Sequence, residues 1–158
     1  EYTTMERLYA AGAAVPKPYA AAENGILMEY IGDEQRAAPA LNEISLPRRV
    51  AYPLFQEILR TIELLLQHAL AHGDLSAYNI LFWEGRAVLI DFPQVVALSA
   101  NRQAKAILQR DITRVCEYFA RQGVRANAST ITNDMWARYG AAIDDDLAAL
   151  FEPPAQIE

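Results

Sequence analysis

Apolar residues recur at three- and four-residue intervals in three stretches of the chain, which is the spacing of an amphipathic helix. The longest stretch spans residues 46–68, with Pro47 and Pro53 near its start, and its stripe is Leu54, Ile58, Ile62, Leu65 and Ala69. The stripe of residues 2–11 is Met5, Leu8 and Tyr9, and that of residues 103–122 is Ile107, Leu108, Ile112, Val115 and Phe119. Gly12 and Gly123 follow the two shorter stretches, where glycine favours a helix end.

Two shorter helices are expected towards the C-terminal end. Thr132 predicts the N-cap of a helix through Trp136 and Tyr139, because a hydroxyl can accept a hydrogen bond from a free backbone N–H. Asp144 predicts the cap of a last helix that ends before Pro153-Pro154. Asp144, Asp145 and Asp146 would fan out around that helix, which favours a solvated first turn over a metal cluster.

Four short apolar runs predict strands. Residues 19–22 and 26–30 are joined by a turn at Asn24-Gly25, and residues 80–83 and 87–90 form a hairpin across Glu84-Gly85-Arg86. Residues 33–45 are polar, rich in alanine and interrupted by proline, which is typical of a connecting loop. The chain therefore combines helices with small antiparallel sheets.

Composition narrows the class of protein. The 158 residues are about one domain's worth, and 53% of them are apolar, enough for a substantial core. The net charge of −6 disfavours a generic nucleic-acid or anionic-membrane binder, and no apolar run approaches the roughly 20 residues of a membrane span. The single cysteine, Cys116, lies among core positions and fits a reducing compartment, so we expect a cytoplasmic protein.

Three polar residues at a particular spacing indicate phosphoryl transfer. The stretch HGDLSAYNIL, residues 72–81, carries Asp74 on a short loop and Asn79 five residues later, and Asp91 follows the next apolar run. A carboxylate such as Asp74 can orient or deprotonate an acceptor hydroxyl. Asn79 and Asp91 offer the oxygen ligands that magnesium prefers. Transfer from a nucleotide needs this set of groups.

Each of these residues also has an ordinary structural interpretation. Asp74 or Asn79 alone could be a turn residue. Asp91 is harder to dismiss, because a charge buried near an apolar strand is costly unless it is paired or bound to metal. His72 favours a loop-ordering role through a backbone hydrogen bond. Whether Ser76 and Tyr78 contact substrate or only shape the loop is open.

The chain resembles the RIO family of atypical protein kinases over residues 1 to about 124. HGDLSAYNIL resembles the family's catalytic loop and IDFPQ its metal-binding loop. Three further segments show the same resemblance. ERLYAAGAAVPKP resembles the end of the family's C helix and the strand after it, LMEYIG resembles the hinge strand, and RDITRVCEYFARQGV resembles a C-lobe helix. The core HGDxxxxN is shared with small-molecule kinases such as aminoglycoside phosphotransferases, whereas Ser76-Ala77-Tyr78 and Pro93-Gln94 favour RIO.

The resemblance implies an α+β, protein-kinase-like fold of RIO type, with a mostly helical C-lobe and a truncated N-lobe. Residues 1–32 would form the end of the N-lobe and the hinge, and residues 33–158 the C-lobe with the catalytic and metal-binding loops. ATP and Mg²⁺ are the implied cofactors. The implied site comprises catalytic Asp74 and Asn79, metal ligands Asn79 and Asp91, and adenine contacts at Met28, Glu29, Tyr30 and Ile31.

Two positions depart from the pattern or match it weakly. Ala77 stands where an acidic residue is common in the family. Glu1 falls where the C-helix glutamate would be expected, but no glycine-rich loop and no strand lysine precede it in this sequence.

The expected function is ATP-dependent phosphoryl transfer to protein serine or to the chain itself, or ATP hydrolysis, with ATP and a protein substrate as partners. Two alternatives stay open. The shared HGDxxxxN core allows a small-molecule phosphotransferase, and the lack of a phosphate loop allows a non-catalytic binding module.

Residues 1–158 alone are expected to bind Mg-ATP weakly and to turn over little. Without a glycine-rich loop and lysine, the β- and γ-phosphates lose most of their hydrogen-bond donors, and positioning by such donors is central to this chemistry. A version extended upstream should bind and turn over, and calorimetric titration with a phosphate-release assay compares the two. Tight binding by the short chain would contradict this view, and no binding by the long one would favour a non-catalytic module.

Overall fold

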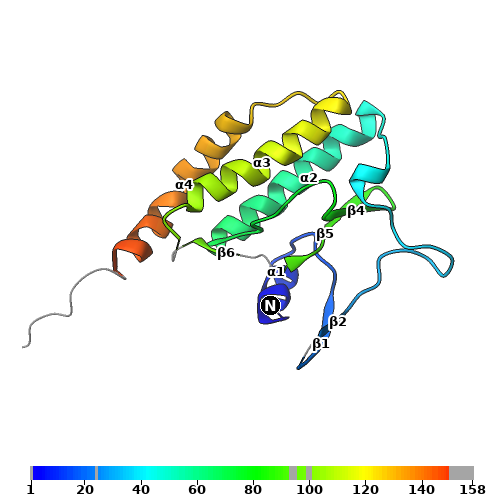
Figure 1. The fold of residues 1–158 in the computed structure, drawn as a ribbon, viewed down its shortest axis with the longest axis horizontal. Coiled ribbons are helices and arrows are strands. Elements are labelled where there is room, and N and C mark those ends of the chain that lie inside the picture. Colours follow the sequence, from blue (N-terminus) through cyan, green and yellow to red (C-terminus); the bar gives the residue numbers. More distant parts are fainter. Residues whose placement is uncertain (1, 24, 93–95, 99–100, 150–158) are drawn as a thin grey trace, which may run out of the picture.

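Three long helices packed side by side dominate the fold, and small sheets and a short helix lie along one side of them (Figure 1). The computed structural model describes residues 2–23, 25–92, 96–98 and 101–149, with residues 96 and 141–149 by their backbone alone. The helices are α1 (Tyr2–Ala10), α2 (Arg48–Gln67), α3 (Ala104–Arg121), α4 (Ala128–Ala149) and the 3₁₀ helix η1 (Leu41–Glu43). The strands are β1 (Pro18–Ala22), β2 (Gly25–Met28), β3 (Leu70–Ala71), β4 (Ile80–Trp83), β5 (Arg86–Leu89) and β6 (Val96–Ala97).

The apolar stripes of α2 and α3 form the centre of the core, as their spacing predicted, except that Ala69 lies beyond the end of α2 with a positive φ of 54° and is half-buried. Ile58 and Phe119 are fully buried, and Phe55 packs against Phe119 with ring centroids 5.2 Å apart. Cys116 is only 7% exposed and belongs to the same core. In α1 the prediction is only partly right, because Met5 and Leu8 are buried whereas Tyr9 is 43% exposed. Burial of these stripes is the main favourable term that holds the helices together.

The predicted C-terminal helices are wrong in their boundaries. One continuous helix, α4, covers this region, and Asn127 caps it, because its Oδ1 accepts a hydrogen bond from the Thr130 N–H at 2.9 Å. Thr132 lies inside the helix, fully buried, and its Oγ1 donates to the Ala128 carbonyl at 2.8 Å. A threonine hydroxyl satisfied in this way does not have to cap a helix. Asp144 is likewise inside α4, and its side chain and Pro153-Pro154 lie outside the described side chains.

The two predicted hairpins are present as antiparallel pairs. Pro18 faces Met28 in the pair of β1 and β2, and the turn residue Asn24 lies outside the described residues. In the pair of β4 and β5, Trp83 faces Arg86, so the turn contains only Glu84 and Gly85. Both turn residues have positive φ (48° and 82°), as a tight two-residue hairpin turn requires.

Residues 33–45 are mostly irregular, as expected, but they are not free of structure. They include η1, and Ala40 bridges to Leu81 at the edge of β4. A third pair, β3 with β6, was not predicted, because each strand has only two residues and too few positions to show a pattern.

A buried carboxylate on α3 holds the loop between β3 and β4. Asp111 is 2% exposed, and its two oxygens accept hydrogen bonds from the N–H groups of Gly73 (2.9 Å) and Leu75 (3.2 Å). Burial raises the pKa of Asp111 above its usual value, against the opposing effects of these hydrogen bonds and of the nearby His72 and Arg110. Arg110 also donates to the Gly73 carbonyl. The loop is thereby fixed on both sides of Asp74.

Asp111→Asn should destabilise the protein by about 2 kcal/mol, because an amide has one acceptor oxygen for two buried N–H donors. The measurement is the free energy of unfolding in urea, with the exposed Asp134→Asn as a control for charge loss.

The pH dependence of the free energy of unfolding gives a second test of the buried Asp111 carboxyl. Because the native carboxyl holds its proton more tightly than the unfolded one, its contribution to the free energy of unfolding falls as pH rises from the unfolded value of 3.8 through the raised native pKa. This dependence should be absent in Asp111→Asn and retained in Asp134→Asn. An unchanged pH profile in Asp111→Asn would contradict the burial argument.

Candidate active site

A pocket of about 470 Å³ lies between the loop after β3, the residues after β5 and one side of α3. The structure brings Asp74, Asn79 and Asp91 together in its lining, as the spacing suggested. The full lining is Asp74, Ser76, Ala77, Tyr78, Asn79, Asp91, Arg114, Glu117, Tyr118 and Arg121.

Asp74 is paired with an arginine of α3. Arg114 Nη1 lies 2.5 Å from Asp74 Oδ1, and both side chains are about half exposed to solvent. This ion pair engages Oδ1 of Asp74, whereas Oδ2 does not take part in it. With the neighbouring Gly73 and Leu75 fixed by Asp111, the Asp74 carboxylate is held at the pocket by its backbone and its side chain.

Asn79 closes the loop back on itself. Its Nδ2 donates to the Asp74 carbonyl at 2.9 Å, and its backbone N–H donates to the Ser76 carbonyl at 3.0 Å. With the nitrogen engaged in this way, Oδ1 is the atom of the amide that can accept from a ligand or bind a cation.

Asp91 lies beside Asn79, because the Ile90 N–H donates to the Asn79 carbonyl at 2.9 Å. Its φ of 65° is uncommon for a residue other than glycine, although aspartate adopts it more readily than most. The sequence suggested that the Asp91 charge would be buried near the apolar strand. The structure shows Asp91 exposed, so no such desolvation cost applies. The strand before it ends at Leu89, so the chain leaves the strand at Ile90 and reaches the pocket at Asp91.

His72 orders the loop, as predicted. The side chain is 1% exposed, and Nε2 lies 2.8 Å from the Ile90 carbonyl oxygen. A carbonyl only accepts, so Nε2 carries the proton and donates. The ring also packs on Phe92, with centroids 5.2 Å apart. His72 therefore links the loop of Asp74 to the segment of Asp91.

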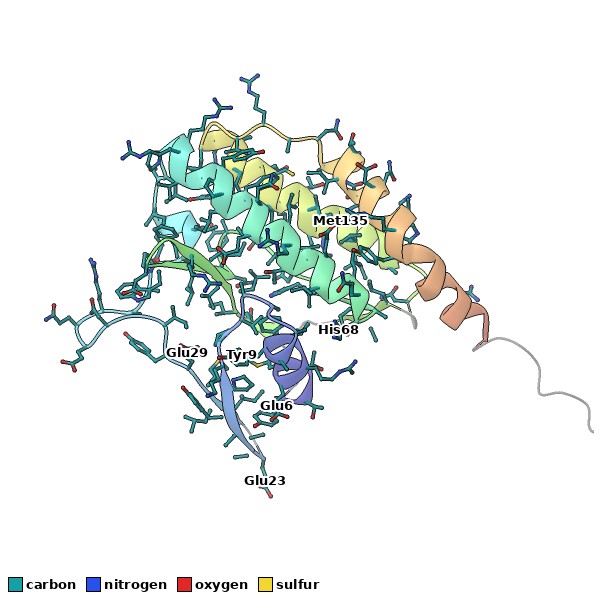
Figure 2. The ribbon with its side chains drawn as sticks, turned by 180° about the vertical axis from the view of Figure 1, so that it is seen from behind. Glu6, Tyr9, Glu23, Glu29, His68 and Met135 are labelled. Atoms are coloured by element: carbon teal, nitrogen blue, oxygen red, sulfur yellow. The ribbon has the colours of Figure 1, made fainter. Side chains whose placement is uncertain are left out.

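The predicted adenine contacts do not line this pocket. Glu29 and Ile31 line a second pocket with Tyr9 and Trp83, and Tyr9 and Glu29 lie close together near the first hairpin (Figure 2). Met28 and Tyr30 are 37% and 63% exposed. Adenine binding by residues 28–31 therefore stays a prediction. Glu1, Pro93 and Gln94 lie outside the described residues.

The sequence reasoning missed the contribution of α3 to the pocket. Arg114, Tyr118 and Arg121 recur at four- and three-residue intervals, so they share one side of the helix, and this spacing was the available signal. The Tyr118 hydroxyl donates to the Ile44 carbonyl at 3.2 Å. Burial raises the pKa of Tyr118, with a partly opposing effect of the Arg121 charge, which favours a neutral phenol at neutral pH.

The residues that the structure describes contain no cluster of three or more His, Cys, Asp or Glu side chains suited to a metal ion. A cation at this pocket would therefore be held by one carboxylate and one amide, which suffices for magnesium because it keeps several waters. No helix in this part of the chain is long and apolar enough to cross a membrane.

Comparison with known proteins identifies the family. The RIO domain family matches residues 1–132. The RIO-type serine/threonine-protein kinase Rio1 of Haloferax volcanii is 34% identical over 132 residues, which are 83% of this chain and 44% of that protein. The Rio1 of Thermoplasma acidophilum is 28% identical over 131 residues, 83% of this chain and 67% of that protein.

A eukaryotic relative gives the same result. The serine/threonine-protein kinase rio1 of Schizosaccharomyces pombe is 32% identical over 123 residues, 77% of this chain and 24% of that protein. The chain thus spans less than half the length of two of these three relatives. The α+β arrangement of helices and small sheets is consistent with a kinase-like fold. On the family match and these relatives together, the chain belongs to the RIO family of protein-kinase-like proteins.

Proposed function

We propose that this chain carries the catalytic and metal-binding loops of a kinase that transfers the γ-phosphoryl group of Mg-ATP to a serine hydroxyl of a protein or of the kinase itself. The observation that carries the proposal is the position of Asp74, Asn79 and Asp91 around one open pocket. The relatives are named serine/threonine kinases, which supports a hydroxyl acceptor on protein.

Asp74 is the group that orients the acceptor. Arg114 engages Oδ1, so Oδ2 can accept a hydrogen bond from the serine hydroxyl and take its proton. The backbone on both sides of Asp74 is fixed by Asp111, so the carboxylate needs little reorganisation when an acceptor binds.

Asn79 and Asp91 fit a magnesium ion by their chemistry. The Asn79 amide has its nitrogen engaged and its oxygen available, and the Asp91 carboxylate is exposed at the same pocket. When bound, magnesium would neutralise charge on the phosphate oxygens. The two residues come from adjacent segments joined by the hydrogen bond between Ile90 and Asn79.

The family match supports the remaining parts of the proposal. Residues 1–32 would form the end of the N-lobe with the hinge, residues 33–158 would form the C-lobe, and residues 28–31 would contact adenine. The free, buried Cys116 fits a cytoplasmic setting. Hydrolysis of ATP would use the same groups, with water in place of serine.

Asp74→Asn should lower the rate of phosphoryl transfer by about 10²- to 10⁴-fold, because the amide cannot take the proton. Nucleotide affinity should change little. Since Arg114 and Asp74 form a half-exposed pair, loss of the pair should cost little stability. The measurement is phosphate transfer from labelled ATP by the intact protein, with Asp134→Asn as the control.

The acceptor decides between the alternatives in the same assay. Phosphate on protein serine supports the proposal, and phosphate release without protein labelling indicates hydrolysis. Labelling of an aminoglycoside or a choline-like compound, with none of protein, would refute the proposed acceptor.

Asp91→Asn should weaken the magnesium-dependent part of nucleotide binding by about 10-fold, because a neutral amide is a poorer ligand for a hard cation than a carboxylate. Binding without magnesium should be unchanged. Calorimetric titration of ADP with and without MgCl₂ measures both terms, again beside Asp134→Asn. Equal affinity of the intact wild-type protein with and without magnesium would count against Asp91 as a ligand.

A further inference from the structure

One side of α3 carries two arginines along the pocket. Arg114 is paired with Asp74, and Arg121 follows seven residues later, about 10 Å further along the helix axis. Arg121 is exposed, and among residues whose side chains the structure describes no carboxylate forms an ion pair with it. The pocket therefore begins at a paired arginine and ends at an unpaired one.

The start of α2 lies beside the same end of α3 (Figure 1), and its first turn carries Arg48 and Arg49. The Leu46 N–H donates to Gln122 Oε1 at 2.8 Å, which ties the segment before α2 to the residue after α3. A Cβ placed on Gly123 would lie 3.8 Å from the Arg48 side chain. Arg48 thus lies beside Gly123, which follows the end of α3 and is two residues beyond Arg121 in the sequence. Arg48 itself lines a neighbouring pocket with Arg49, Tyr52 and Pro53, and not the pocket of Asp74.

Positive charge in the first turn of α2 is unfavourable with respect to the dipole of that helix. Arg48 and Arg49 form the first turn of α2, which has no acidic residue, although the N-terminal end of a helix dipole repels cations. Both are exposed, and neither is in an ion pair within the described side chains.

We propose that Arg121 at the end of the pocket, with Arg48 on the neighbouring start of α2, forms an anion-binding subsite that selects a protein acceptor with an acidic or phosphorylated side chain about three residues from its serine. The inference rests on the proposed function, which places the serine hydroxyl at Asp74. Three extended residues span about 10 Å, which matches the distance from Arg114 to Arg121 along α3.

Glu117 restricts the position at which the pocket accepts an acidic side chain of the peptide. It is exposed and lines the pocket between Arg114 and Arg121 in the sequence of α3, and no ion pair joins it to Arg121 in the described structure. An acidic side chain next to the acceptor serine would face this carboxylate, whereas one three residues away would reach Arg121. The subsite therefore disfavours acid at the first position and favours it at the third.

The test is fluorescence anisotropy with labelled serine peptides that carry glutamate, phosphoserine or alanine three residues to either side of the serine. The intact protein should bind the glutamate peptide about 5-fold more tightly than the alanine peptide, and the phosphoserine peptide about 10-fold more tightly. The preference should appear on one side of the serine only. Arg121→Gln and Arg48→Gln should each reduce it, and Arg60→Gln, an equal charge change on the exposed part of α2, should leave it intact.

Reversing the charge of Arg121 distinguishes recognition of the peptide from an effect on folding. Arg121→Glu should bind a peptide with lysine at the third position more tightly than one with glutamate, which a loss of folding would not produce. Equal binding of all peptides by the wild type, or preference for a single-stranded RNA of the same charge over both acidic peptides, would overturn the proposal.

The phosphate-transfer assay on the same peptides distinguishes this proposal from the kinase proposal. Transfer that is indifferent to acid at the third position refutes the subsite and leaves the kinase proposal standing. Selective binding without transfer to any peptide supports the anion-binding subsite and refutes the proposed function.

Discussion

The two hydrogen bonds from Gly73 and Leu75 to the Asp111 carboxylate are the contacts on which the rest of the site depends. A buried carboxylate is costly unless its oxygens are satisfied, and two backbone N–H groups offset that cost here. Because these donors flank Asp74, satisfying Asp111 also fixes the position of Asp74. The burial of one carboxylate in the core is thus coupled to the placement of another at the surface.

The hairpin of β4 and β5 and the hydrogen bonds beside it join the segments that form the pocket. His72 connects the first loop to Ile90, and Ile90 connects in turn to Asn79. Each bond alone contributes modestly to stability, about 1 kcal/mol. The bond between Ile90 and Asn79 continues the pairing of β4 with β5, in which Ile80 faces Leu89, so Asn79 and Asp91 stay adjacent although twelve positions separate them in the sequence.

The sequence predicted those parts of the structure that follow from local patterns. The stripes of α2 and α3 were visible because burial repeats along a helix, and Asp74, Asn79 and Asp91 were visible through their spacing. The contribution of Asp111 and Arg114 was not, because each acts on a loop about 40 positions away in the sequence. Thr132 misled the prediction of α4, since the same hydroxyl can cap a helix or bond within one, and tertiary packing decided between them.

Arg110, Asp111 and Arg114 share little more than one turn of a single helix, and all three contact the loop that carries Asp74. A turn of a packed helix behaves as a rigid body on the timescale of side-chain motion. A small displacement of α3 would therefore carry the Asp74 loop with it. The ion pair between Asp74 and Arg114 would be kept in such a displacement, because both partners are held by the same helix.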